Sequence, residues 1–180
     1  DRFSALLFEA FSQMKQGDCA PPLLPPGHPV DLLVTTTDFR GHFEMLRLNS
    51  PPVVIETEHR TPISFRGLAP ERAERDLADP LELVLAARAT ASFPGAFPPL
   101  MVAEIDALAE QNKHHWTTRG EFLSRILPMH KREGTLENVS LIDGSVLVNA
   151  PFGGAIAALE GRPAQREVDR RFVYIDPRPD

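Results

Sequence analysis

Residues 139–145 read Val-Ser-Leu-Ile-Asp-Gly-Ser, a short apolar run that ends in an acid and a glycine. The run Val139–Ile142 predicts a buried strand, because short apolar segments bounded by turn residues are typical of sheet interiors. An acid at the exit of such a strand lies at the sheet edge, where the active sites of α/β proteins collect. Asp143 is therefore a candidate general base for a hydroxyl nucleophile, and Gly144 allows a sharp turn and leaves room beside it.

Helices and strands are expected to alternate along the rest of the chain, which predicts the α/β class. Hydrophobic spacing and turn residues predict helices at Phe3–Met14, Asp79–Ser92, Ala103–Gln111, Thr118–Leu127 and Pro151–Leu159. Further strands are predicted at Val30–Thr37, Phe43–Leu48, Val53–Glu58 and Arg171–Ile175, the first of them buried. Two local signals are specific: Asn49–Pro52 predicts a hairpin, and Thr118 with Glu121 has the spacing of a capping box.

Two other segments could contribute to a site, although each also has a plain structural interpretation. The segment Arg88–Pro99 ends a helix in small residues and Phe-Pro pairs, so Phe93, Phe97 and Pro98 could form the apolar wall of an acyl pocket. Taken alone, it is explained by core packing and a turn. The step Thr37-Asp38 places an acid just past a predicted strand, where turn formation is the default, as it is for Asp-Gly pairs.

The composition fits a folded chain and excludes several classes of function. A length of 180 residues suggests one domain or a piece of one. The net charge of −6 gives no support to nucleic-acid binding. No apolar run approaches the ~20 residues of a membrane helix and no secretion signal is recognisable, so a cytoplasmic location is expected. Residues 19–29 carry five of the 18 prolines and are predicted to form a stiff connector.

No cofactor and no metal ion are expected from the motifs. Glycine-rich phosphate loops and the His-Glu-x-x-His pattern are absent from the sequence. The adjacent His114 and His115 would point in different directions on either a strand or a helix, so they are not expected to share a metal ion. A single cysteine, Cys19, excludes an internal disulfide and a cysteine zinc site.

Taken together and in this order, these segments resemble the patatin-like lipid acyl hydrolases. The matching residues are Thr37-Asp38, then Ala87–Ser92 followed by Phe97-Pro98-Pro99, then Asp143-Gly144-Ser145 followed by Asn149-Ala150-Pro151. The matches extend from about Leu32 to Leu159 and cover most of the chain. The insert from Asp38 to Phe65 is most similar to that of the larger bacterial patatin-related proteins.

The resemblance implies a three-layer α/β/α fold and a Ser–Asp dyad in which Asp143 is the base that activates a serine toward a lipid ester. Ser145 stands where the family usually has glycine or alanine. The family's nucleophile elbow, Gly-x-Ser-x-Gly, is absent, because no serine of the chain has glycine at both −2 and +2. The glycine-rich oxyanion loop is absent as well. Residues 1–180 are therefore expected to be the C-terminal part of a patatin domain, inactive without the remaining N-terminal part.

Two alternatives stay open at this stage. The first is a non-catalytic module on the same scaffold that binds lipid or another protein, so the expected partners are a lipid ester or a membrane surface. The second is an unrelated α/β domain in which Asp143 only forms a turn. In that case, Asp143 would not lie in a cleft beside Asp38 and the 93–99 segment.

Overall fold

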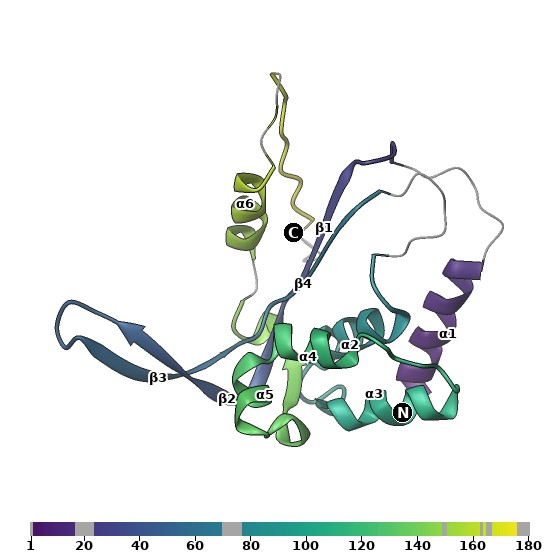
Figure 1. Ribbon diagram of the computed structural model, residues 1–180, viewed down its shortest axis with the longest axis horizontal. Helices are drawn as coiled ribbons and strands as arrows, with labels where there is room; N and C mark the ends of the chain where they lie inside the picture. The colour runs from purple at the N-terminus through teal and green to yellow at the C-terminus, as the bar shows by residue number, and fades with distance from the viewer. Residues whose placement is uncertain are drawn as a thin grey trace.

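The structure is a computed structural model that describes residues 2–16, 24–69, 77–148, 151–162, 164 and 167–175. It confirms a mixed α/β fold (Figure 1). The helices are α1 (Arg2–Gln16), α2 (Pro80–Thr90), α3 (Val102–Gln111), α4 (Arg119–Ile126), α5 (Pro128–Glu133) and α6 (Phe152–Glu160), with short 3₁₀ turns η1 (Leu136–Asn138) and η2 (Gly144–Val146). The strands are β1 (Pro29–Val34), β2 (Thr36–Arg47), β3 (Val53–Arg60), β4 (Ile63–Leu68), β5 (Leu100–Met101) and β6 (Ser140–Asp143).

The strands of the described part of the chain form two sheets in which neighbouring strands are antiparallel. One sheet has the order β3-β2-β6-β5, and the other is a two-stranded ribbon of β1 and β4. The β2–β3 hairpin and the β1–β4 ribbon both extend away from the group of helices α1 to α4 (Figure 1). The three-layer order implied by the family resemblance remains a prediction.

The core is built around α2. Asp79 caps this helix by accepting a hydrogen bond from the Leu81 backbone N–H at 2.9 Å, as its Asp-Pro start predicts. Side chains on most sides of α2 are buried, because α1, α3 and β6 all pack against it. The fully buried apolar side chains of this core include Leu81, Val84, Leu85, Ala89, Ile63, Leu100, Ile105, Leu123 and Val139. The predicted buried strand at Val139–Ile142 is confirmed as β6 in this core.

The prediction of one buried strand at Val30–Thr37 was wrong in two respects. The segment is divided at Thr35 between β1 and β2, and these two strands belong to different sheets. In addition, β1 is half-exposed, with Leu32 and Leu33 at 39% and 40% exposure. The physical reason is that β1 pairs only with β4, so the described residues provide no third strand to continue this ribbon.

Two further predictions were wrong. Thr118 does not form a capping box, because its hydroxyl donates to Glu82 Oε1 on α2 at 2.5 Å instead of bonding its own helix. Residues Arg171–Ile175 form no strand, and the side chains of Val173 and Ile175 are exposed. An extended apolar run needs a neighbouring strand to become part of a sheet, and this one has none among the described residues.

The remaining predicted helices are confirmed within two residues, and so are the turn and the second strand of the hairpin. The prediction that its first strand is Phe43–Leu48 was wrong at the start, because β2 begins at Thr36 and continues through the irregularity between Thr37 and His42. The hairpin joins β2 and β3, with Met45 opposite Ile55. Part of the predicted proline-rich connector at 19–29, and the Asn149-Ala150 step, lie outside the described residues. In the described part of the chain, no helix has both the length and the apolar character needed to cross a membrane.

Candidate functional site

Asp143 lies at the carboxyl end of β6, where the chain enters η2. Its backbone N–H donates to the Ser92 carbonyl oxygen at 3.1 Å. Its side-chain Oδ1 accepts a hydrogen bond from the Ser145 backbone N–H at 2.8 Å. The residue is half-buried. A carboxylate held in this way has a defined orientation and still reaches the surface, as a general base requires.

Gly144 is required by a close backbone approach. A Cβ atom at this position would lie 2.3 Å from the carbonyl carbon of Thr35 and 2.4 Å from its oxygen. Backbone atoms cannot move aside as the end of a flexible side chain can, so any larger residue would push η2 away from the start of β2. The space beside Gly144 is therefore occupied by Thr35.

The three candidate segments of the sequence come together at this point. In the β2–β6 pairing, Thr36 lies opposite Asp143 and Asp38 lies opposite Leu141. The third segment joins through the hydrogen bond from the Asp143 N–H to Ser92. Asp143 therefore bonds the Ser92 end of one segment directly, whereas the Thr37-Asp38 step pairs with Ile142 and Leu141, the two residues before Asp143.

A buried arginine holds the segment after α2 in place. Arg88 has no exposed surface, and its guanidinium donates from Nη1 to Ser92 Oγ at 2.5 Å and from Nη2 to the Pro98 carbonyl at 3.1 Å. The Ser92 hydroxyl in turn donates to the Arg88 carbonyl at 2.8 Å. These bonds fix the ends of the 92–98 segment against α2.

The predicted pocket wall lies at the surface. Phe93 and Phe97 are 55% and 46% exposed, and Pro98 is exposed as well. The Phe97 ring stacks on Phe3 of α1, with 5.4 Å between the ring centroids. The segment thus contacts the first helix, and its role in lining an acyl pocket remains a prediction.

Two hollows lie near these elements. One of about 320 Å³ is beside the β2 end of the site and is lined by residues that include Val34, Thr36, Pro62, Val148 and Gly154. This hollow includes Thr36, the register partner of Asp143, but Asp143 is not among the residues that line either hollow. The larger one, about 750 Å³, lies over the β1–β4 ribbon and includes Asp31 and Arg125.

A second cluster surrounds Asp38. Asp38 lies inside β2 with no exposed surface, so the prediction that it forms a turn past the strand end was wrong. The strand is strongly bulged here: Thr37 pairs with Arg60 and His42 pairs with Glu58, so residues 38–41 oppose a single residue of β3. Gly41 supports the bulge with a φ of +73°, a conformation that side-chain-bearing residues rarely adopt.

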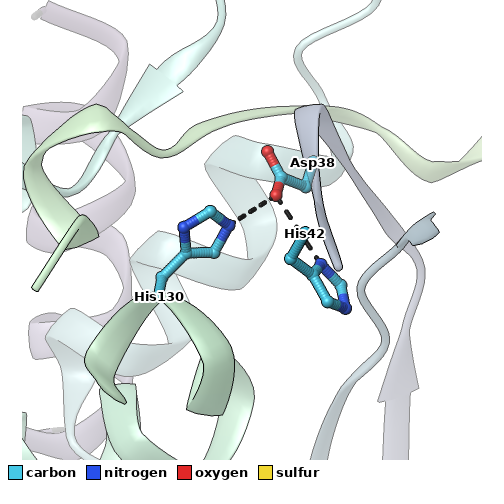
Figure 2. A group of neighbouring side chains, drawn as sticks. All are labelled: Asp38, His42 and His130. Atoms are coloured by element: carbon cyan, nitrogen blue, oxygen red, sulfur yellow. Dashed lines mark hydrogen bonds and ion pairs between the residues drawn. The ribbon is translucent and has the colours of Figure 1, made fainter. Parts of the chain in front are cut away.

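The bulge brings His42 back toward Asp38, and α5 contributes His130 from the other side (Figure 2). His130 Nε2 is 2.7 Å from Asp38 Oδ2, and His42 Nδ1 is 3.7 Å from the same oxygen. The other carboxylate oxygen, Oδ1, accepts from the Arg40 backbone N–H at 3.2 Å. The far ring nitrogen of His130 is 2.9 Å from Thr135 Oγ1.

Sequence reasoning did not identify this cluster. The Asp-x-x-x-His spacing with a glycine before the histidine was the only local signal, and an unbulged strand would have carried His42 away from Asp38. Nothing near His130 in the sequence pointed to Asp38. The histidines that were considered, His114 and His115, have different environments: His114 Nε2 is 2.9 Å from Asp79 Oδ2, and His115 is exposed.

Comparisons with protein families, curated proteins and solved structures find no match for this chain. Its function has to be inferred from its own residues.

Proposed function

We propose that this chain is the aspartate-bearing part of a patatin-like serine lipid acyl hydrolase, with Asp143 as the general base. The observation that carries the proposal is the convergence on Asp143 of the segments that resemble the family. Thr36 pairs with Asp143 across the sheet, and the Ser92 carbonyl accepts from the Asp143 N–H. Segments that lie far apart in the sequence thus meet at the strand end that carries Asp143.

The arrangement suits the first step of ester hydrolysis. Asp143 would accept the proton of a serine hydroxyl as the serine oxygen attacks the acyl carbonyl. The ester C–O bond then breaks, the acyl group stays on the serine, and the alcohol leaves with a proton. The Ser145 N–H holds Oδ1, and a carboxylate with fixed orientation loses less entropy when the serine arrives.

The nucleophile has to come from a segment outside residues 1–180, because no serine here has the glycine neighbours of a nucleophile elbow. Ser145 itself bonds Asp143 through its backbone N–H and follows it by two residues, which makes it part of the turn around the base. The isolated chain is therefore expected to lack esterase activity.

One observation favours the alternative, a non-catalytic module that binds a lipid surface or another protein. One face of the β2–β3 hairpin is apolar and exposed: Phe43 and Met45 lie opposite Thr57 and Ile55, and the side chains of Phe43, Met45 and Ile55 are all exposed. An exposed apolar surface of this kind is typical of an interaction site. It would be used for binding whether or not Asp143 takes part in catalysis.

The decisive experiment uses two preparations and a nitrophenyl ester of a short fatty acid. The isolated chain should show no turnover above buffer and no labelling by a fluorophosphonate serine probe. The chain joined to a segment that carries Gly-x-Ser-x-Gly should hydrolyse the ester, and Asp143→Asn should abolish this activity. Glu137→Gln, at an exposed position on η1, serves as the matched control and should keep it.

Two results would overturn the proposal. The first is turnover by the isolated chain that Asp143→Ala removes, because this would place a nucleophile within residues 1–180. The second is an active longer protein that is unaffected by Asp143→Asn. If the longer protein is inactive and the isolated chain floats with lipid vesicles, the binding module is the better description.

A further inference from the structure

The cluster of Asp38, His42 and His130 has the composition of a metal site. Each residue offers one ligand atom, and the three atoms lie within 4.8 Å of one another. Two imidazoles and one carboxylate are a donor set that Zn²⁺ takes in proteins. Figure 2 shows both rings directed at the same carboxylate oxygen of Asp38.

Hydrogen bonding alone does not account for the cluster. Both ring nitrogens of His130 have hydrogen-bond partners: Nε2 is 2.7 Å from Asp38 Oδ2, and Nδ1 is 2.9 Å from Thr135 Oγ1. His42 is different: its Nδ1 is buried and has no hydrogen-bond partner, and at 3.7 Å from Asp38 Oδ2 it is too far away for a hydrogen bond. Burying a polar atom without a hydrogen-bond partner costs about 1–3 kcal/mol of folding free energy. The orientation of His42 Nδ1 toward Asp38 therefore has to be stabilised by another interaction.

We propose that Asp38 Oδ2, His42 Nδ1 and His130 Nε2 bind one divalent transition-metal ion of the Zn²⁺ class. Ligand atoms around tetrahedral zinc, with bonds of about 2.0–2.1 Å, are about 3.3 Å apart. The distances of 2.7 Å and 3.7 Å from Asp38 Oδ2 lie on either side of this value. Side-chain adjustments of about half an ångström would bring each imidazole nitrogen to this separation from Asp38 Oδ2, and the two nitrogens themselves lie within 4.8 Å of each other.

The surroundings of the three ligands support the site. Thr135 can accept the Nδ1 proton of His130, which directs the Nε2 lone pair at the metal; such outer partners are usual for metal-bound histidine. The Arg40 N–H holds Oδ1 of Asp38, so Oδ2 is the oxygen presented to both rings. His59 fixes the bulge itself, with its Nδ1 2.8 Å from the Asp38 carbonyl oxygen.

Three protein ligands leave a fourth position for water. The side chain of His42 is 20% exposed, whereas Asp38 is fully buried, so an ion would enter from the His42 side. Bound there, the metal would tie α5 to β2 beside Leu141, two residues before the candidate base Asp143. Oxygen-preferring ions such as Ca²⁺ and Mg²⁺ suit this donor set poorly. The proposal is independent of ester hydrolysis.

The test measures metal binding directly. The untagged chain in a Cys19→Ser background, which removes its one thiol, is stripped with a chelator and titrated with ZnCl₂ by calorimetry and against a chromophoric zinc indicator. One Zn²⁺ per chain is expected, with a rise in Tm on binding. Co²⁺ should bind at the same stoichiometry and develop the visible bands of a low-coordinate nitrogen and oxygen site.

Variants then assign the ligands. His42→Ala removes a ligand whose side chain is 20% exposed, and it should weaken Zn²⁺ binding by at least about 10–100-fold, the loss typical of outer-shell changes alone. Thr135→Val should weaken it by about 10–100-fold while keeping all three ligands. His115→Ala, which removes an exposed histidine elsewhere, is the matched control and should bind as the parent does.

Failure of the parent chain to bind Zn²⁺ would overturn the proposal, and so would equal binding by the parent and His42→Ala. Circular dichroism of each variant without metal shows whether the fold is kept. If His42→Ala does not fold, Thr135→Val decides, since unchanged affinity there would contradict a site in which Thr135 holds a metal-bound His130, and the proposal would fail. None of these readouts depends on esterase activity.

Discussion

The backbone N–H of Asp143 donates to the carbonyl oxygen of Ser92 at 3.1 Å and so joins the end of β6 to the turn after α2. Because the Ser92 hydroxyl is bonded to the buried Arg88, the position of Asp143 depends on this guanidinium through Ser92. The charged Arg88, which is buried in the core, therefore supports the position of Asp143 through Ser92.

Ser92→Ala should lower the free energy of unfolding by about 1–3 kcal/mol, because it removes the buried hydroxyl that accepts from Arg88 Nη1 and donates to the Arg88 carbonyl oxygen. Urea unfolding followed by circular dichroism measures the change. Ser124→Ala is the matched control: Ser124 lies on the exposed side of α4, where its hydroxyl bonds its own helix, and the change should be near zero. Equal effects of the two substitutions would contradict a supporting role for Ser92.

Gly144→Ala should be destabilising by about 1–3 kcal/mol, because the added Cβ would lie 2.3 Å from the Thr35 backbone and force β2 and η2 apart. The control is Gly120→Ala in α4, where no atom lies within 4 Å of the added Cβ. Alanine in a helix is favoured over glycine by roughly 0.5–1 kcal/mol, so this variant should be as stable as the parent or more so. Chemical unfolding of both variants measures these changes in stability. A Gly144→Ala variant as stable as the parent would refute the prediction.

Local signals in the sequence predicted the elements that depend on few neighbours. Asp79-Pro80 marks the start of α2 because the cap and the fixed proline φ act within one turn. The run at 139–142 predicts β6 because it is short, largely apolar and bounded by turn residues. The hairpin at Asn49–Pro52 has its own turn residues. Each of these signals is complete within a few residues, which is why sequence reasoning found them.

Features that depend on distant partners could not be predicted. Thr118 has the spacing of a capping box, but Glu82 of another helix accepts its hydroxyl hydrogen bond. The break at Thr35 depends on β1 and β2 joining different sheets. The cluster at Asp38 needs both a four-residue bulge and His130, which follows 92 residues later, so no local pattern contains it.

Asp79→Ala should cost about 0.5–2 kcal/mol through loss of the α2 cap, since the Leu81 N–H loses its acceptor. Asp79→Asn keeps a side-chain oxygen for the cap and should cost less. The stability that Asp79→Asn still loses measures the contact between Asp79 Oδ2 and His114 Nε2, which are 2.9 Å apart. Thermal and urea unfolding of the pair check the order; an asparagine variant as unstable as the alanine variant would show that the cap contributes little.

The ion pair of Glu58 and Arg60 should make the free energy of unfolding depend on pH in the acid range. Hydrogen bonds from the Arg60 side chain, together with the backbone N–H groups of His59 and Arg60, lower the pKa of the Glu58 carboxyl from 4.5 to about 2. A carboxyl whose pKa is lower in the folded state than in the unfolded state stabilises the fold above its unfolded pKa. This contribution is lost as the pH falls from about 4.5 to about 2. Because the Arg60 side chain is 63% exposed, we expect at most about 1 kcal/mol.

The measurement compares urea unfolding of the parent and Glu58→Gln from neutral pH down through this window. At neutral pH the parent should be the more stable of the two, because only it has the charged pair. The difference should shrink as the pH falls toward the folded pKa, since protonation removes the charge that glutamine lacks at every pH. Glu137→Gln, at an exposed position on η1, is the control and should follow the parent throughout. A difference between the parent and Glu58→Gln that stays constant with pH would mean that the charge on Glu58 does not stabilise the bulged end of the hairpin.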